Sequence, residues 1–460
     1  DALTIEWDND GALDVSSEQV FSSYHKAADE DPGESERSEG DYDDAQQGAE
    51  RVVEASYEQP YLAHATLEPM NATAWYRDGA IEVWAPTQAP DLGRIAAARV
   101  TDLSPDEVTI HTTFLGGGFG RRLTNDYIEE AASVAYRVRK PVKLIWSREE
   151  DTRHDVYRPA MLHRMRASVS GDNVTGWHHQ IVGPQILDWY VRNAAPAQYP
   201  WAPKFLYGTL GRVGLLAEGV ATPKDHSAIE GAIEYPYRVP NIDIRHTHTD
   251  PGVPVSWWRS VGFSHNGFAV ETFMDELAHE QGQDPYRFRR SLIDHEPRHL
   301  GVLDRVAQLA QWDSAAPEGR ARGVALFRSF GTYVAQVVEA SVEFGEIRVH
   351  RVCCAVDCGQ VVNPDIVRDQ IEGGIIFGLT AALYGNITLE GGQVQQSNFH
   401  DYPLMRHDQR PEVVVDIIDS DESPTGVGEP GVPPVIPALG NALFALSGKR
   451  QRSLPLKATV

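Results

Sequence analysis

The stretch TGVGEPGVPP, residues 425–434, places a single carboxylate, Glu429, among glycines and prolines. Glycine lets the backbone come close to another group, whereas proline fixes φ and stiffens the chain. The pattern therefore predicts a rigid loop that holds Glu429 in crowded surroundings. An isolated segment of this kind is more often a surface turn with a solvated glutamate, so the rest of the chain must decide between the two interpretations.

The composition is typical of a large globular protein. The chain has 460 residues, of which 42% are hydrophobic and 23% are charged, enough for two or three lobes. No apolar run reaches the roughly 18 residues that a membrane-spanning helix requires. The net charge of -25 argues against binding to nucleic acid, because phosphate contacts require clustered lysine and arginine.

The three cysteines, Cys353, Cys354 and Cys358, lie within six residues of one another on a strand-like stretch. An iron–sulfur cluster usually takes four thiolates, so this set is too small to hold one. We expect three buried thiols. They leave the redox compartment undecided.

The order of sequence patterns predicts a mixed α/β (α+β) protein with two main lobes. Residues 1–27 read as the last strand region of a preceding small α/β domain, because DALTIEW begins abruptly with alternating apolar positions. Residues 28–50 are acidic and aperiodic, which predicts an exposed linker. The lobes are expected at residues 51–312 and 313–460, joined through SAAPEGRARG.

Within these lobes, a strand over residues 106–114 runs into a glycine loop and then into a helix over residues 125–140. Helical spacing recurs at residues 268–282 and 298–312. Residues 347–357 and the segment VAQVVEASVE before them predict neighbouring strands.

The glycine loop GGGFG, residues 116–120, could let a bulky polar ligand lie against main-chain N–H groups, but a structural turn is equally consistent with it. Arg121 stands where a dinucleotide-binding motif has its third glycine, and no phosphate-loop lysine follows. The chain also lacks a serine-hydrolase elbow and metal-ligand spacings. His64 and His400 are expected to be structural hydrogen-bonding residues.

Six stretches in one order together resemble the molybdopterin-binding subunit of the xanthine dehydrogenase family, and within it the isoquinoline 1-oxidoreductase branch. These stretches are LEPMNATAW (67–75), FLGGGFGRRL (114–123), WWRSVG (257–262), DCGQVVNPDIVRDQIEGG (357–374), FHDYPLMR (399–406) and GVGEPGVPP (426–434). The resemblance extends from about Arg51 to Val460. It implies two molybdopterin-binding lobes, with the second carrying the glutamate loop.

The resemblance also implies roles for single residues. Molybdenum would be held by the dithiolene of the pterin, in its cytosine dinucleotide form, so the protein would supply no direct metal ligand. Glu429 would be the catalytic general base. The cofactor would contact the backbone of the glycine loop and a second set of residues, which together are Gly117, Gly118, Phe119, Gly120, Arg259, Gln370 and Gly428. Arg259 would act largely through its main chain. Two alternatives stay open: Arg259 as an ordinary buried ion-pair partner and Gln370 as a helix cap.

Partners are implied by what the sequence lacks. The family glutamine that precedes the L-E motif aligns near Leu62, and no E-M-G-Q-G segment occurs. We therefore expect the N-terminal portion of the large subunit on another chain. The resemblance further implies a small subunit with [2Fe–2S] clusters and cytochrome c as electron acceptor. The branch implies a periplasmic location, with the cytoplasm as the alternative.

The expected substrate is an N-heteroaromatic compound or an aldehyde, oxidised with water as the oxygen source. Trp257, Trp258, Phe263, Trp189 and Tyr190 could form an aromatic channel for it, although such residues are more often core. The alternative function is a structural or interaction subunit of a redox assembly that has no chemistry of its own.

Overall fold

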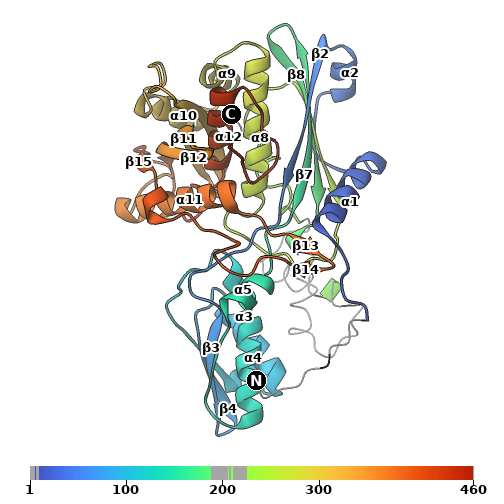
Figure 1. The fold of residues 1–460 in the computed structure, drawn as a ribbon, viewed down its shortest axis with the longest axis vertical. Helices are drawn as coiled ribbons and strands as arrows, with labels where there is room; N and C mark the ends of the chain where they lie inside the picture. The colour runs from blue at the N-terminus through green and yellow to red at the C-terminus, as the bar shows by residue number, and fades with distance from the viewer. Residues whose placement is uncertain (1–5, 7–9, 188–205, 207–208, 211–224, 459–460) are drawn as a thin grey trace.

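The computed structural model describes residues 6, 10–187, 206, 209–210 and 225–458. Three sheets organise this part of the chain, together with a two-stranded ribbon (Figure 1). Helices and sheets of mixed strand direction alternate through the fold, which confirms the predicted mixed α/β class.

The largest sheet has five strands in the order β1-β9-β8-β7-β2. Its strands are β1 (Glu34–Glu39), β2 (Arg51–Gln59), β7 (Met161–Ser170), β8 (Asn173–Gly183) and β9 (Asn241–His248). Neighbouring strands are antiparallel except for the parallel pair β8 and β9. One face carries buried side chains such as Trp177, which belong to the main hydrophobic core.

The acidic segment at residues 28–50 is mostly exposed, as the sequence predicted, but it is not an irregular linker. It contains β1, which pairs with β9, and the short helix α2 (Tyr42–Gln47). Tyr42 is 8% exposed and its ring lies 5.2 Å from that of His178. The prediction failed because a polar edge strand needs little apolar periodicity when the backbone ladder and one aromatic anchor hold it.

The region before this segment is helical where a strand region was expected. Helix α1 (Ser17–Glu30) begins with a capping box between Ser16 and Gln19 and buries Val20 and Tyr24. The DALTIEW strand itself falls on residues 1–7, which lie almost wholly outside the described part of the chain.

A smaller sheet, in the order β5-β4-β3-β6, forms the lower lobe in Figure 1. Its strands are β3 (Asn71–Arg77), β4 (Ala80–Ala85), β5 (Val108–Thr112) and β6 (Val142–Ile145). Helices α3 (Pro90–Thr101) and α4 (Asp126–Val138) pack on it. The predicted order of strand, glycine loop and helix is confirmed by β5, residues 116–120 and α4.

The third sheet has the order β10-β11-β12-β15. Its strands are β10 (Ala321–Ser329), β11 (Thr332–Glu343), β12 (Glu346–Asp357) and β15 (Glu412–Ile417). The predicted neighbouring strands are the antiparallel pair β11 and β12. The three cysteines are free and buried, as expected, and burial raises the pKa of each thiol.

Helix α8 (Val261–Glu280) contacts β2 and β7 of the five-stranded sheet and β10 of the third sheet, which explains why nearly all of its length is buried. Helix α11 (Pro364–Tyr384) and helix α12 (Val435–Ser447) pack against each other, and α10 (Pro297–Leu309) packs on β11 and β12. The remaining elements are α5 (Arg148–Arg153), α9 (Pro285–Leu292), β13 (Leu389–Glu390), β14 (Gln393–Val394) and the short 3-10 turns Pro105–Glu107, Arg121–Leu123 and His407–Gln409. The lobe boundary predicted at residues 312 and 313 stays a prediction.

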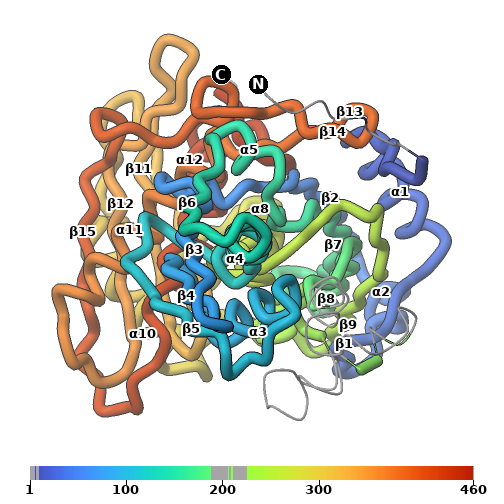
Figure 2. The backbone as a smooth tube through the Cα atoms, turned by 90° about the horizontal axis from the view of Figure 1, so that it is seen from below, coloured from blue at the N-terminus to red at the C-terminus, as the bar shows by residue number. Residues whose placement is uncertain are grey.

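The view from below in Figure 2 places the small sheet and α4 in front of α8. The start of α8 therefore faces the small lobe, where the glycine loop lies. None of the helices in the described part of the chain combines the length and the apolar character needed to cross a membrane.

Candidate active site

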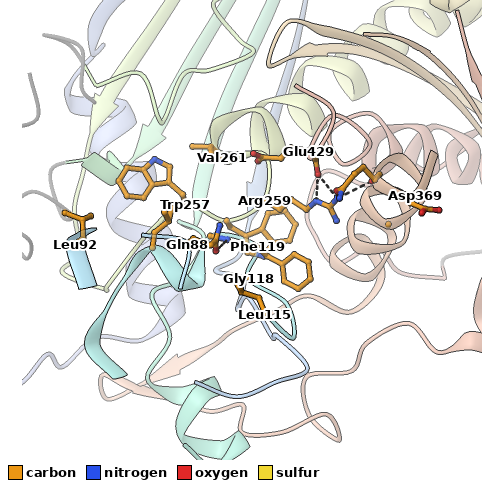
Figure 3. A pocket seen from close by; sticks show the side chains of 16 residues that line it. Gln88, Leu92, Leu115, Gly118, Phe119, Trp257, Arg259, Val261, Asp369 and Glu429 are labelled. Carbon is orange, nitrogen blue, oxygen red and sulfur yellow. Dashed lines mark hydrogen bonds between the residues drawn. The ribbon is translucent and has the colours of Figure 1, made fainter. Parts of the chain in front are cut away.

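A cavity of about 890 Å³ lies where the small lobe meets the start of α8 and the first turns of α11 (Figure 3). This volume is within the range of small-molecule and cofactor sites. It is lined by Gln88, Leu92, Leu115, Gly118, Phe119, Gly120, Leu123, Trp257, Trp258, Arg259, Val261, Asp369, Gln370, Gly373, Gly428 and Glu429. The structure thus brings together every predicted site residue except Gly117 at one cavity.

The glycine loop forms the wall from the small lobe. A Cβ at Gly120 would lie 1.5 Å from the carbonyl oxygen of Trp257, and one at Gly118 would lie 2.6 Å from Oε1 of Gln88. Gly120 also has a φ of 107°, a conformation that glycine adopts readily. Gly117 does not line the cavity, but its carbonyl accepts a hydrogen bond of 2.7 Å from Nε of Arg122. Glycine at 120 allows the close approach of two backbones, while the ligand cradle expected from the sequence at residues 116–120 stays a prediction.

The carboxylate of Glu429 is held by the start of α8. The backbone N–H of Ser260 donates to Oε2 of Glu429 at 2.5 Å, and Oγ of Ser260 donates to the backbone carbonyl oxygen of Glu429 at 2.8 Å. Burial raises the pKa of Glu429 above its ordinary value, while the Ser260 N–H and the Arg259 guanidinium oppose that rise. A carboxylate with increased proton affinity at a cavity wall suits a general base.

The loop around Glu429 is crowded, as the glycines and prolines predicted. A Cβ at Gly431 would lie 2.6 Å from the carbonyl oxygen of Ile371 on α11, and Gly374 of α11 faces Gly431 in return. Nε2 of Gln336 donates to the Gly431 carbonyl at 3.0 Å. Contacts from α11 and β11 therefore fix the loop from two sides.

Arg259 connects this loop to α11 through its side chain. Its Nε and Nη2 donate to the Gly428 carbonyl at 2.9 and 2.6 Å, and Nη2 also donates to Oε1 of Gln370 at 3.2 Å. Figure 3 shows the guanidinium between Glu429 and the part of α11 that carries Asp369. The predicted main-chain contact of Arg259 with the cofactor stays a prediction, and the forked guanidinium in addition orders the wall.

Gln370 is not a helix cap. The start of α11 is capped by Asn363, whose side chain accepts from the N–H groups of Asp365 and Ile366. Gln370 lies about two turns further along and lines the cavity. It is therefore placed to contact a bound molecule.

An aromatic stack supports the floor of the cavity. The rings of Phe119 and Phe377 lie 4.5 Å apart, and those of Phe377 and Trp258 lie 4.6 Å apart. Trp257 and Trp258 line the cavity as expected. Phe263 instead packs on Phe327 and Phe330. Trp189 and Tyr190 lie outside the described residues.

His64 belongs to a buried network behind the cavity. Its Nδ1 lies 3.0 Å from Asp155, and its Nε2 lies 3.0 Å from the Trp257 carbonyl. Arg121 also pairs with Asp155 at 3.2 Å. The predicted structural role of His64 is confirmed, since the network fixes the backbone that Gly120 touches. His400 has no such structural role, because its side chain is 74% exposed and its Nε2 lies 3.4 Å from Oδ2 of the neighbouring Asp401.

Sequence reasoning missed Gln88 and Ser260. Oε1 of Gln88 accepts from the N–H of Gly120 at 3.2 Å, and Ser260 holds Glu429. Gln88 precedes a helix in the segment APTQAP, which reads as an ordinary turn. Ser260 lies inside the WWRSVG motif, next to Arg259, but only the meeting of two distant segments reveals its contact.

Comparison with known protein families identifies the family of this chain. Two molybdopterin cofactor-binding domain models match the chain, one at residues 24–183 and the other at residues 303–411. The chain belongs to the xanthine dehydrogenase family of molybdopterin-binding proteins. The first matched region includes the glycine loop, and the second includes Gln370.

Two curated relatives of this molybdopterin-binding chain extend over most of its length. It is 31% identical to isoquinoline 1-oxidoreductase subunit beta of Brevundimonas diminuta, over 88% of the chain and 50% of the relative. It is 30% identical to the membrane-bound aldehyde dehydrogenase [pyrroloquinoline-quinone] of Gluconacetobacter polyoxogenes, over 90% of the chain and 54% of the relative. The chain thus spans about half the length of these relatives.

Among solved structures, quinoline 2-oxidoreductase from Pseudomonas putida 86 has a similar fold. The TM-score is 0.75 at 14% sequence identity, and the match covers 91% of this molybdopterin-binding chain and 77% of the other. At this identity the similarity concerns the fold alone.

The cavity of the molybdopterin-binding chain fits its family's cofactor. The glycine wall leaves room that a Cβ would fill, and amide, guanidinium and backbone groups face the space. Among the described residues, no group of three His, Cys, Asp or Glu side chains could hold a metal ion. This donor set is compatible with a metal whose ligands come from the cofactor itself.

Proposed function

We propose that the chain forms the molybdenum site of a hydroxylase that oxidises an electron-poor carbon of an N-heteroaromatic compound or an aldehyde, with water as the oxygen source. One observation carries the proposal: the half-buried Glu429 carboxylate lies at the cavity wall, fixed by the Ser260 N–H at 2.5 Å. A scaffold subunit has little use for such a carboxylate beside a glycine cradle.

When bound, the molybdenum cofactor, in its cytosine dinucleotide form, would supply the two-electron oxidation. Gln370 and the backbone of Gly118, Phe119 and Gly120 would hold it, since these groups face the cavity. Arg259 would keep the Glu429 loop in register by its bonds to the Gly428 carbonyl. Glu429 would accept the proton released as the new C–O bond forms, and its raised pKa favours that uptake.

The cavity suits a neutral substrate better than an anionic one. Among its described lining residues, Arg259 is the one cation, and its Nε and Nη2 already donate to Gly428 and Gln370. Asp369 and Glu429 add negative charge, while Leu92, Leu115 and Leu123 are apolar. We expect quinoline-like heterocycles and aromatic aldehydes to be oxidised in preference to their carboxylate derivatives, because burying an unpaired anion is costly.

We further propose that the chain acts within an assembly. The N-terminal portion of the large subunit on another chain would complete the cofactor site, and a small [2Fe–2S] subunit would take the electrons and pass them to cytochrome c. The three buried cysteines support this division of labour, because their raised pKa values disfavour the thiolates that a cluster needs. We place the assembly in the periplasm.

The test begins with molybdenum analysis of the natively purified assembly and identification of every co-purifying chain. Glu429→Gln should keep the molybdenum content and lower kcat by a factor of about 10² to 10⁴, the usual contribution of a general base. Asp369→Asn is the control, because it removes another carboxylate of the same cavity. Undiminished turnover in Glu429→Gln would contradict the proposed role, and a complete assembly without molybdenum would favour the structural alternative.

A further inference from the structure

A second carboxylate, that of Glu230, is hydrogen-bonded to the same helix start as Glu429. Oε2 of Glu230 accepts a hydrogen bond of 3.2 Å from the backbone N–H of Gly262, two residues after the Ser260 N–H that holds Glu429. Glu230 does not line the cavity, so it faces this helix start from outside the site. Backbone N–H groups at the start of α8 thus donate hydrogen bonds to two carboxylates from two distant segments.

The backbone at this point is strained. Ser260 has a φ of 76° and Val261 a φ of 43°, and a β-branched residue rarely adopts a positive φ. The N–H groups of Ser260 and Gly262 donate to the two carboxylates, whereas the Val261 N–H donates to the Trp258 carbonyl at 2.7 Å. The positive end of the α8 dipole adds to the attraction, because the four initial N–H groups of a helix lack partners within it.

The segment that carries Glu230 is fixed to α8 by specific contacts. Nδ2 of Asn266 donates to the carbonyl oxygens of Ala228 and Glu230 at 3.0 and 2.9 Å, and Asn266 is 0% exposed. A Cβ at Gly262 would lie 2.5 Å from the carbonyl oxygen of Ser227 and 3.0 Å from Cβ of Glu230. Glycine at 262 therefore permits the close approach that brings Glu230 to the helix.

We propose that Glu230 is a positioning residue that sets the proton affinity of Glu429 from the other side of the start of α8. In this arrangement Glu230 stays protonated while Glu429 is ionised. The inference rests on the proposed function, in which Glu429 is the base.

The electrostatic surroundings agree with this division. Burial raises the pKa of Glu230 to about 7, and the negative charges of Glu234, Asp225 and Glu429 add to the rise against the opposing Gly262 hydrogen bond. Glu429 instead has the Arg259 guanidinium beside it, which favours its ionised form. The negative charge of Glu429 raises the pKa of Glu230, so a proton taken up by Glu429 weakens the hold of Glu230 on its own proton.

The test is an infrared titration of protonated carboxyl groups in the substrate-free assembly, which does not depend on turnover. The wild type should show a carboxyl that titrates near pH 7, and Glu230→Gln should lose it. Glu234→Gln is the control for the identity of the group: the titrating carboxyl should persist, at a lower pH, because the charge of Glu234 adds to the pKa rise of Glu230. In Glu429→Gln the same titration should move downward by roughly 0.5 to 1 pH unit, since a nearby negative charge has gone.

Turnover provides the second readout. Glutamine imitates protonated glutamate, so Glu230→Gln should match the wild-type kcat/KM within about twofold at pH 6 and should lack the wild-type inflection near pH 7. An unchanged inflection, or a titration in Glu429→Gln that does not move, would overturn the proposal. If Glu230→Gln fails to fold, the Glu429→Gln titration still decides. Activity retained in Glu429→Gln would instead contradict the proposed function and leave the titration result standing.

Discussion

Replacing Gly120 with alanine should close the glycine wall of the cavity. The new Cβ would lie 1.5 Å from the carbonyl oxygen of Trp257, whereas real Cβ atoms essentially never approach another heavy atom within 3.0 Å. The two backbones must therefore separate by about 1.5 Å, because neither is a side chain that could rotate away. That shift would also break the 3.0 Å contact between Nε2 of His64 and the same carbonyl.

The cost follows from these contacts. A non-glycine residue at a φ of 107° costs about 1–3 kcal/mol, the forced separation about 1–3 kcal/mol, and the lost hydrogen bond about 0.5–1.5 kcal/mol. Gly79 offers a control, since it has a φ of 83° in the turn between β3 and β4 and a Cβ there would meet nothing within 4 Å. Gly120→Ala should therefore lose about 2–4 kcal/mol more stability than Gly79→Ala.

Urea unfolding of both variants measures this difference, and elemental analysis of the purified assemblies measures the cofactor. We expect Gly120→Ala to retain less than a tenth of the wild-type molybdenum and Gly79→Ala to retain nearly all of it. Equal stability and equal molybdenum in the two variants would refute the reasoning, because the close approach to Trp257 would then have no energetic consequence.

Three further predictions concern other parts of the chain. Because the pKa of Glu230 is raised from 4.5 to about 7, the folded state keeps the proton of this carboxyl to a higher pH than the unfolded state. The stability that the proton contributes is full below about pH 4.5 and falls as the pH rises to about 7, by up to about 1.4 kcal/mol per pH unit. Urea unfolding of Glu230→Gln, measured as a function of pH, should lack that slope. Arg259→Lys should lower kcat about 10- to 100-fold with molybdenum content retained, since an ammonium cannot bond the Gly428 carbonyl as a planar fork does, and an unchanged kcat would exclude this role. Tyr42→Ala should destabilise the protein by about 2–4 kcal/mol and expose residues 28–50 to proteolysis, whereas a true linker would be cleaved equally in the wild type.

Local patterns were sufficient for many elements of the fold. The strand before the glycine loop and the helix after it were predicted because apolar periodicity is a property of neighbouring residues. The same is true of α8, α10 and the β11–β12 pair. Segment 28–50 was predicted wrongly for the complementary reason. An edge strand such as β1 is specified by its ladder with β9, about 200 residues away, and not by its own sequence.

The sequence by itself determined the family of the protein and most of the residues at its cavity, because six motifs in a fixed order identify a set of positions even when each motif is weak alone. It also predicted that the loop at Glu429 would be stiff and crowded, since glycine and proline constrain the backbone wherever they stand. Only the tertiary structure decided what touches that loop. Ser260 holds Glu429, Arg259 bonds Gly428, and Glu230 reaches the same helix start from another segment. Hydrogen bonds between residues more than 30 positions apart leave no periodic trace, because their geometry exists only once the lobes have packed together.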